Sequence, residues 1–158
     1  MNKFIIKFGE FVSIVCLVAF IMFINAEDKV TEKSAEELGF SVISSINVDG
    51  LTMQDMNGLK KQFGISDKQI DSFIYYKSDD VMDVREVLIV KVADNTSGQS
   101  IFSSVEKVLS DKKTLFESYA PEQSALLNKA VLVYENNIVF YAVGEDATIA
   151  YESLLESL

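Results

Sequence analysis

Residues 114–143, TLFESYAPEQSALLNKAVLVYENNIVFYAV, contain the signals that decide the fold. Pro121 is the only proline of the chain, and it lacks the amide hydrogen that a helix interior requires, although its fixed φ suits the first turn of a helix. We therefore expect a long helix to end before Pro121 and a short helix to run over 121–127. Two apolar strands, 129–134 and 138–143, are expected to follow, joined by a turn whose two asparagines tolerate positive φ.

A second pair of apolar segments lies upstream. Residues 72–77 (SFIYYK) and 85–93 (REVLIVKVA) are rich in the aromatic and β-branched residues that favour strands. Glu86 begins a face that continues with leucine and valine at every second position, and the opposite face carries valine, isoleucine and lysine. Both faces are partly apolar, so we expect helices to cover one side of the sheet and the other side to be partly exposed.

The remaining segments have the spacing of helices. Apolar residues recur every three or four positions over 35–46, and Thr52 resembles the cap of a short second helix. A long helix is expected to be capped by Thr96, with Lys112 on its water-facing side, and a last helix to be capped by Asp146. The order helix, helix, hairpin, helix, hairpin, helix predicts an α+β fold. In this fold a four-stranded, largely antiparallel sheet from two β-hairpins has helices packed on one face.

The composition excludes several classes of function. The chain has 158 residues and a net charge of −10, which repels phosphate backbones, so we expect no nucleic-acid partner. It has no histidine, the commonest general base and a usual zinc ligand. Its single cysteine, Cys16, cannot form an intramolecular disulfide. We expect no cofactor.

The N-terminus predicts a targeting or anchoring segment. Lys3 and Lys7 precede the apolar run FVSIVCLVAFIMFINA at 11–26, and acidic residues follow. This order is typical of a signal anchor or of a signal peptide that is removed. We favour the anchor, which would make a single-pass protein of the cell membrane with its C-terminal domain outside; cleavage would instead give a secreted protein. Residues 27–33 are predicted as a short charged spacer and 34–158 as a single α+β domain. The side chains expected to contact lipid are Phe11, Ile14, Leu17, Phe20 and Phe23.

Two groups of carboxylates are candidates for chemistry. Asp79, Asp80 and Asp83 could bind calcium through oxygen ligands, but their spacing does not match an EF-hand loop, and we favour a solvated hairpin loop. Glu117 and Glu122 flank the bend before the proline and could be the paired carboxylates of a small envelope hydrolase. We favour instead a wet helix face for Glu117 and the first helical turn for Glu122, where a negative charge is favourable.

Several segments resemble a known family. Glu86 opens the REVLIVKV strand, FESYAPEQ at 116–123 is similar to the family's aromatic, acidic, Tyr-x-Pro-Glu-Gln segment, and a strand beginning Ala130-Val131 and a hairpin follow. This family is domain of unknown function 4358, small extracytoplasmic proteins of Gram-positive bacteria that usually carry a lipoprotein signal or one N-terminal membrane segment. The resemblance implies a location and a fold, and no catalytic residues. The residues that carry the motif are Glu86, Phe116, Tyr119, Pro121, Glu122 and Gln123.

Together these observations predict a non-catalytic binding or interaction module of the cell envelope. Its partner would be an envelope protein or another envelope component, in addition to the membrane that the N-terminal segment contacts. The alternative is the small hydrolase with paired carboxylates. We expect the interaction surface at an uncovered part of the sheet near Phe73, Tyr75 and Tyr76.

Overall fold

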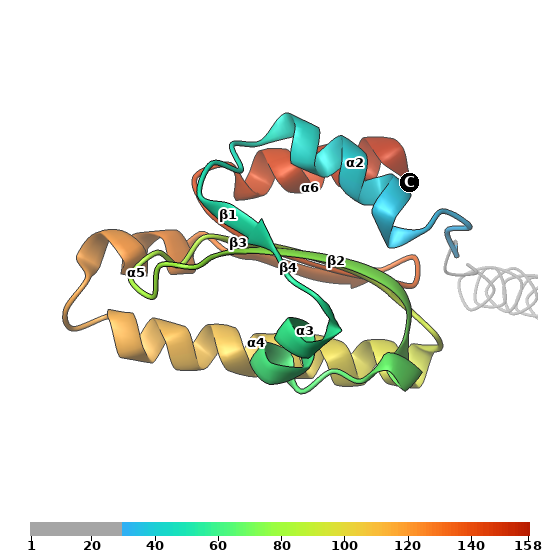
Figure 1. Ribbon diagram of the computed structural model, residues 1–158, viewed down its shortest axis with the longest axis horizontal. Coiled ribbons are helices and arrows are strands. Elements are labelled where there is room, and N and C mark those ends of the chain that lie inside the picture. Colours follow the sequence, from blue (N-terminus) through green and yellow to red (C-terminus); the bar gives the residue numbers. More distant parts are fainter. Residues whose placement is uncertain (1–29) are drawn as a thin grey trace, which may run out of the picture.

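A computed structural model describes residues 30–158, in which one sheet lies between two layers of helices. Helices α2 and α6 lie side by side on one face of the sheet, α3 and α4 cover the other face, and α5 lies at one end (Figure 1). In chain order the elements are α2 (Ala35–Ser45), β1 (Leu51–Met53), α3 (Met56–Phe63), the short 3-10 helix η1 (Asp67–Gln69), β2 (Ile70–Ser78), β3 (Glu86–Val92), α4 (Asn95–Phe116), α5 (Pro121–Asn128), β4 (Val131–Glu135), β5 (Ile138–Val143) and α6 (Ala147–Ser157).

The sheet is antiparallel throughout, with strand order β1-β2-β3-β5-β4. The predicted hairpins β2-β3 and β4-β5 both form, and the pairing of β3 with β5 joins them into one sheet. In this register Leu88 of β3 lies opposite Tyr75 of β2 and opposite Tyr141 of β5. The two tyrosines therefore flank the central strand at the same height.

Local signals around the proline are confirmed. Pro121 occupies the first turn of α5, after a bend that ends α4 at Phe116. The tight turn between β4 and β5 places Asn136 at φ 50° and Asn137 at φ 58°, which is the left-handed conformation that asparagine tolerates.

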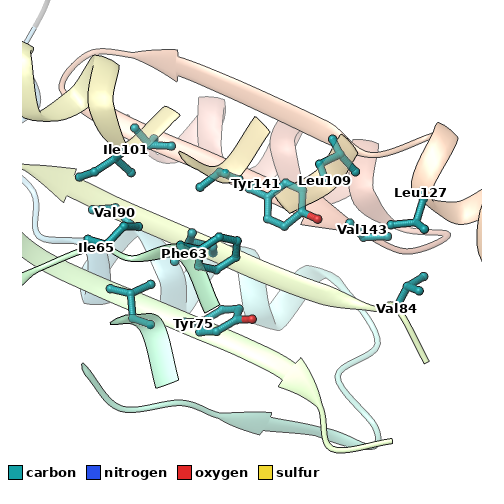
Figure 2. Packing of buried hydrophobic residues seen from close by; sticks show 14 of the residues in the cluster. Phe63, Ile65, Tyr75, Val84, Val90, Ile101, Leu109, Leu127, Tyr141 and Val143 are labelled. Carbon is teal, nitrogen blue, oxygen red and sulfur yellow. The ribbon is translucent and has the colours of Figure 1, made fainter. Parts of the chain in front are cut away.

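Two hydrophobic cores share the sheet. Strand β3 contributes to both because its side chains alternate, with Leu88 and Val90 on the α3–α4 side and Val87 and Ile89 on the α2–α6 side. Figure 2 shows part of the α3–α4 core, where the rings of Tyr75 and Tyr141 lie among apolar side chains and their hydroxyl groups point in the same direction. The prediction that helices cover only one face is therefore wrong: α2 and α6 bury the second apolar face of β3.

The sheet of the described chain also has five strands where the sequence predicts four. The additional strand is β1, which pairs with the end of β2 and contains Thr52, expected to cap a helix. The cap of α3 is instead Asp55, whose carboxylate accepts a hydrogen bond from the Gly58 N–H at 2.9 Å. Likewise α4 is capped by Asp94, which accepts from the Ser97 N–H at 2.8 Å, and not by Thr96.

Near the start of the described chain, Thr31 contacts the turn between β4 and β5. Thr31 is 8% exposed, and its N–H donates to the Asn137 side-chain oxygen at 3.0 Å and, at 3.4 Å, to the Asn136 carbonyl oxygen. This part of the predicted 27–33 spacer is therefore fixed against the sheet. The predicted membrane segment at 11–26 lies outside the described residues, and within 30–158 no helix has the length and apolar character needed to cross a membrane.

Candidate functional site

A buried carboxylate organises the α3–α4 core. Glu86 is 1% exposed, and its Oε2 accepts a hydrogen bond from the Tyr75 hydroxyl at 2.9 Å while Oε1 accepts one from the Tyr141 hydroxyl at 2.8 Å. Lys112 of α4 forms an ion pair with Oε1. A buried charge is tolerated when it is paired and hydrogen-bonded, and Glu86 has both kinds of partner.

The strand register explains how the tyrosines reach Glu86. Tyr75 and Tyr141 both lie opposite Leu88, two positions after Glu86 on the same face of β3, so each is a diagonal neighbour of the carboxylate. Burial, followed by the negative charge of Glu86, raises the pKa of Tyr75 and of Tyr141 far above the usual range. Both tyrosines therefore remain protonated donors at any physiological pH.

Sequence reasoning identified Glu86 as a motif residue but missed all three of its partners. Tyr75 was expected on an exposed surface. Lys112 was expected to face water, yet its side chain is only 23% exposed and is directed to Glu86. Tyr141 looked like one more apolar strand residue. The available signal was the carboxylate itself, because Glu86 begins the strand face that continues with Leu88 and Val90, and a charge on such a face requires partners.

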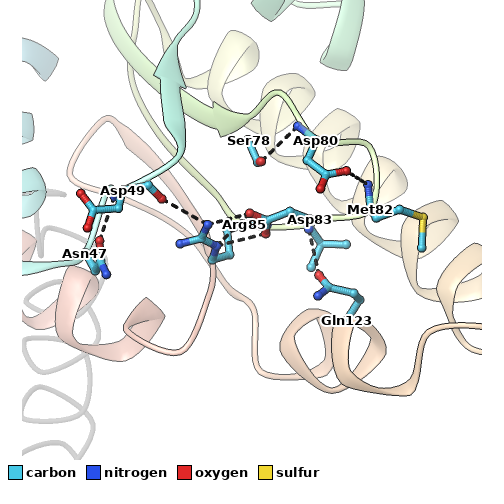
Figure 3. Close-up of polar contacts among 9 residues, drawn as sticks. Asn47, Asp49, Ser78, Asp80, Met82, Asp83, Arg85 and Gln123 are labelled. Carbon is cyan, nitrogen blue, oxygen red and sulfur yellow. Dashed lines mark hydrogen bonds and ion pairs between the residues drawn. The ribbon is translucent and has the colours of Figure 1, made fainter.

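An ion pair marks the end of the sheet at which β3 begins. The Nε atom of Arg85 donates to both carboxylate oxygens of Asp83 at 3.0 Å, and Nη2 donates to Asp83 Oδ2 at 2.7 Å and to the Asp49 carbonyl oxygen at 3.2 Å (Figure 3). Burial alone would raise the pKa of Asp83, but the hydrogen bonds and the charge of Arg85 outweigh it and lower that pKa. The pair also connects the loop before β3 to the segment before β1.

Helix α5 also contacts the loop that precedes β3. The Gln123 side-chain oxygen accepts a hydrogen bond from the Val84 N–H at 3.0 Å (Figure 3). Phe116, at the end of α4, is buried, and the partly exposed ring of Tyr119 packs against it with ring centroids 5.3 Å apart. The motif residues in α4, α5 and β3 therefore form the packing around one end of the sheet, whereas Glu122 is exposed in the first turn of α5.

A cavity of about 440 Å³ lies at this end. Its polar lining includes Asp83, Arg85, Gln123, Glu145 and Asp146. Its apolar lining comes from the end of α2, from β1, β3, β5, α5 and the start of α6, and consists of Ile46, Leu51, Val87, Leu126, Ala142, Val143, Ala147 and Ala150. Polar and apolar atoms contribute about equally to the surface of this cavity. Ligand sites are concave and combine apolar side chains with a few placed polar groups.

A smaller cavity of about 260 Å³ lies on the other side of Arg85. Glu86 and Lys112 both line it, together with Lys77 and Asp80. Glu86 accepts from three donors among the described residues, the two tyrosine hydroxyls and the Lys112 ammonium group. We interpret the Glu86 cluster as a structural anchor between α4 and the sheet.

The predicted aromatic surface does not form. Tyr75 is fully buried, and Phe73 is partly buried against the same α3–α4 core. Tyr76 points to the opposite face, where it packs against the α2–α6 core. The reason is that both faces of β2 are covered by helices, so that alternate residues of the strand enter different cores.

The two candidate carboxylate sites are not assembled either. Asp79 accepts from the Thr52 hydroxyl, Asp80 accepts from the Met82 N–H, and Asp83 pairs with Arg85, so each makes a separate local contact. Within residues 30–158 no group of three potential metal ligands comes together. The other candidates, Glu117 and Glu122, are exposed, and neither lines the cavities described above.

Comparison with known proteins assigns the chain to a family. No curated protein and no solved structure gives a significant match. Residues 44–144 match the family described as Domain of unknown function (DUF4358), and this range is more than half of the chain. It includes Glu86 with its partners Tyr75, Tyr141 and Lys112, as well as the Arg85 pair. The geometry around the start of β3 therefore lies within the family domain, and the chain belongs to the DUF4358 family.

Proposed function

We propose that this protein is a membrane-tethered domain, held outside the cytoplasm, that acts by binding a protein or another component of the cell envelope. The tether is the apolar segment at 11–26, which follows Lys3 and Lys7 and precedes acidic residues. A segment of this order, left uncleaved, anchors a chain with its C-terminal part outside. The net charge of −10 disfavours direct adsorption of the domain to an anionic lipid surface.

The cavity beside Arg85 is the observation that supports binding. Its volume of about 440 Å³ falls within the roughly 300–1,000 Å³ that is usual for ligand sites. It is walled by elements that are far apart in the sequence, from Ile46 to Ala150, and Gln123 and the Asp83–Arg85 pair fix its polar side. A partner that enters the cavity would therefore contact polar side chains that are already held by a hydrogen bond and an ion pair.

The state of the charged groups favours binding over catalysis. Asp83 and Arg85 bond to each other, and Glu86 is occupied by two hydroxyls and an ammonium group. A general base must lie within hydrogen-bond reach of its substrate, whereas these groups are directed to partners within the domain. Glu117 and Glu122, the alternative pair, are exposed side chains away from the cavity lining.

The test uses the full chain in the membrane of intact cells that produce it. A photo-crosslinking residue at position 145, on the cavity rim, should yield an adduct with an envelope component. The same residue at the exposed position 61 of α3, which lines none of the cavities described here, should yield none.

The location is tested separately: a membrane-impermeant reagent should label a cysteine at position 61 without lysis. Labelling only after lysis would contradict the location, and equal adducts at both positions would contradict the site.

A further inference from the structure

The cavity beside Arg85 carries an excess of negative charge. Three carboxylates line it, those of Asp83, Glu145 and Asp146, against the single base Arg85. Asp49 is also close: its carbonyl oxygen accepts from Arg85 Nη2 at 3.2 Å, although its side chain is not part of the lining. The field inside the cavity is therefore set by its acidic residues.

Arg85 does not neutralise this excess, because Asp83 already balances its charge. Their ion pair uses Nε and Nη2 of the guanidinium and both oxygens of the carboxylate. Within residues 30–158, Glu145 and Asp146 form no ion pair. Asp146 accepts a backbone hydrogen bond from Asn47 at 3.3 Å, and Glu145 is exposed at the rim. The charge of Glu145 acts on Arg85 without a direct bond, and the lining still holds three carboxylates against one guanidinium.

Partly exposed aliphatic side chains accompany these carboxylates in the lining. They are Leu51 of β1, Leu126 of α5 and Ile46, which directly follows α2, whereas Val87, Ala142, Ala147 and Ala150 are buried in the core. An aliphatic chain placed against Ile46, Leu51 and Leu126 would remove apolar surface from water on both sides. The lining therefore suits a molecule that has a positive end and an aliphatic body.

We propose that the cavity binds an organic cation, namely an ammonium or guanidinium group on a short aliphatic chain. The inference rests on the proposed binding function and names its ligand class. The cationic group lies against Glu145 and Asp146, and the methylene groups lie against the partly exposed side chains of Ile46, Leu51 and Leu126. Two sources present this chemistry: a lysine or arginine side chain of a partner protein, and a free polyamine.

The neighbouring cavities provide a comparison. In the 260 Å³ cavity the acids Asp80, Asp83 and Glu86 are matched by Lys77, Arg85 and Lys112, so no excess remains. A third cavity, of about 400 Å³, has Glu32, Asp71 and Asp94 against Lys91, but Val30, Val92 and Ala93 are its only aliphatic side chains other than that of Lys91. In addition, Asp94 is engaged as the cap of α4. Charge excess and partly exposed aliphatic side chains from several elements occur together in the cavity beside Arg85.

Alanine methyl groups report separately on the proposed site, on the third cavity and on one further groove. Ala142, Ala147 and Ala150 line the proposed site, Ala93 lines the third cavity, and Ala130 lines a groove beside α4. The full chain, labelled with ¹³C at alanine methyl groups and held in mild detergent, is titrated with spermidine and, separately, with the blocked peptide acetyl-Gly-Lys-Gly-amide. Both should shift the three alanines at the site. Sodium butyrate, which has an aliphatic chain and a negative charge, should not.

Charge variants test the role of the carboxylates. Glu145→Gln should weaken binding of the cation by up to about fivefold, the range expected for one partly exposed ion pair. Asp146→Asn keeps an acceptor for the Asn47 N–H and should weaken binding similarly, whereas Glu36→Gln on α2, outside the lining, should have no effect. The alanine spectrum of each variant without ligand shows whether its fold is intact.

Four outcomes would overturn the inference: no shift at the three alanines with either cation, shifts confined to Ala93, equal binding of butyrate, or unchanged affinity in both carboxylate variants. Binding of the peptide alone would identify a protein side chain as the source, and binding of spermidine alone a free polyamine. Adducts from position 145 in intact cells together with no response to cations would leave the binding function standing with a different ligand.

Discussion

Lys112 of α4 and Glu86 of β3 form an ion pair across the interface between the longest helix and the sheet, 26 positions apart in the chain. The carboxylate is buried and the lysine side chain is 23% exposed, so the pair lies at the border of the core. Because Tyr75 and Tyr141 bond to the same carboxylate, one charged group joins β2, β3, β5 and α4.

Removing the positive member of this pair should be costly. Lys112→Met leaves the buried carboxylate without its counter-charge, and we expect a loss of roughly 2 to 4 kcal/mol in the free energy of unfolding, reduced by the partial exposure of the lysine. Urea unfolding of the full chain, followed by far-ultraviolet circular dichroism, measures it. Lys107→Met on the same helix breaks an exposed pair with Asp111 and should change little. Equal effects of the two variants would contradict the anchoring role.

The tyrosine hydroxyls should contribute separately measurable stability. Tyr75→Phe and Tyr141→Phe each remove one donor to an ionised acceptor, a contribution of about 1 to 3 kcal/mol. The double variant should deviate from additivity, because both hydroxyls bond to one carboxylate. Tyr76→Phe on the opposite face is the matched control and should be near neutral. A tyrosine variant as stable as the parent would indicate that water replaces the lost donor.

Stability should decline at alkaline pH. Burial and the hydrogen bond to Glu135 raise the pKa of Tyr151 to about 12, and burial raises the pKa of Tyr75 and Tyr141 further. The stability that these shifts provide is complete below about pH 10, the ordinary pKa of tyrosine, and is lost above it because only the unfolded chain then releases protons. The melting temperature of the parent protein should fall from about pH 10 upward. The melting temperature of Tyr151→Phe should fall less than that of the parent between pH 10 and 12. An unchanged pH profile in this variant would contradict the assignment.

The hydrogen bond from Val84 to Gln123 should control the mobility of the loop before β3. Gln123→Ala removes the acceptor for the Val84 N–H, and we expect a loss of about 1 kcal/mol with faster hydrogen exchange over residues 79–85. Exchange measured by mass spectrometry on peptides of the full chain checks this. Glu122→Gln, at the neighbouring exposed position, should leave the exchange of this segment unchanged. Unaltered exchange in Gln123→Ala would show that the Arg85 pair alone holds the loop.

Local signals in the sequence predicted the parts of the fold that depend on few residues. Pro121 defined where one helix ends and the next begins, and the two asparagines defined the tight turn, because backbone geometry at these residues is set by their own chemistry. The alternation along β3 also predicted which of its residues share a face. These features need no information about distant segments.

The parts that failed depend on contacts between distant segments. Leu51–Met53 is too short to show a period, and it becomes a strand because β2 extends far enough to pair with it. The second face of the sheet is covered because α2 and α6, which come from the two ends of the domain, pack side by side on it. Lys112 lies among other charged residues of α4, and only the position of Glu86 on the facing strand shows that it points inward. The cavity combines residues from six elements and the loops between them, so no local pattern could reveal it.

The contact of Thr31 with the turn at Asn136 and Asn137 has a consequence for orientation. Strand β5 runs from this turn to Val143 at the cavity, six residues or about 20 Å away. The chain thus arrives at one end of the sheet, and the cavity opens at the other. The acidic cavity therefore lies about the length of one strand away from the point at which Thr31 joins the sheet, so a ligand can reach it without displacing the start of the described chain.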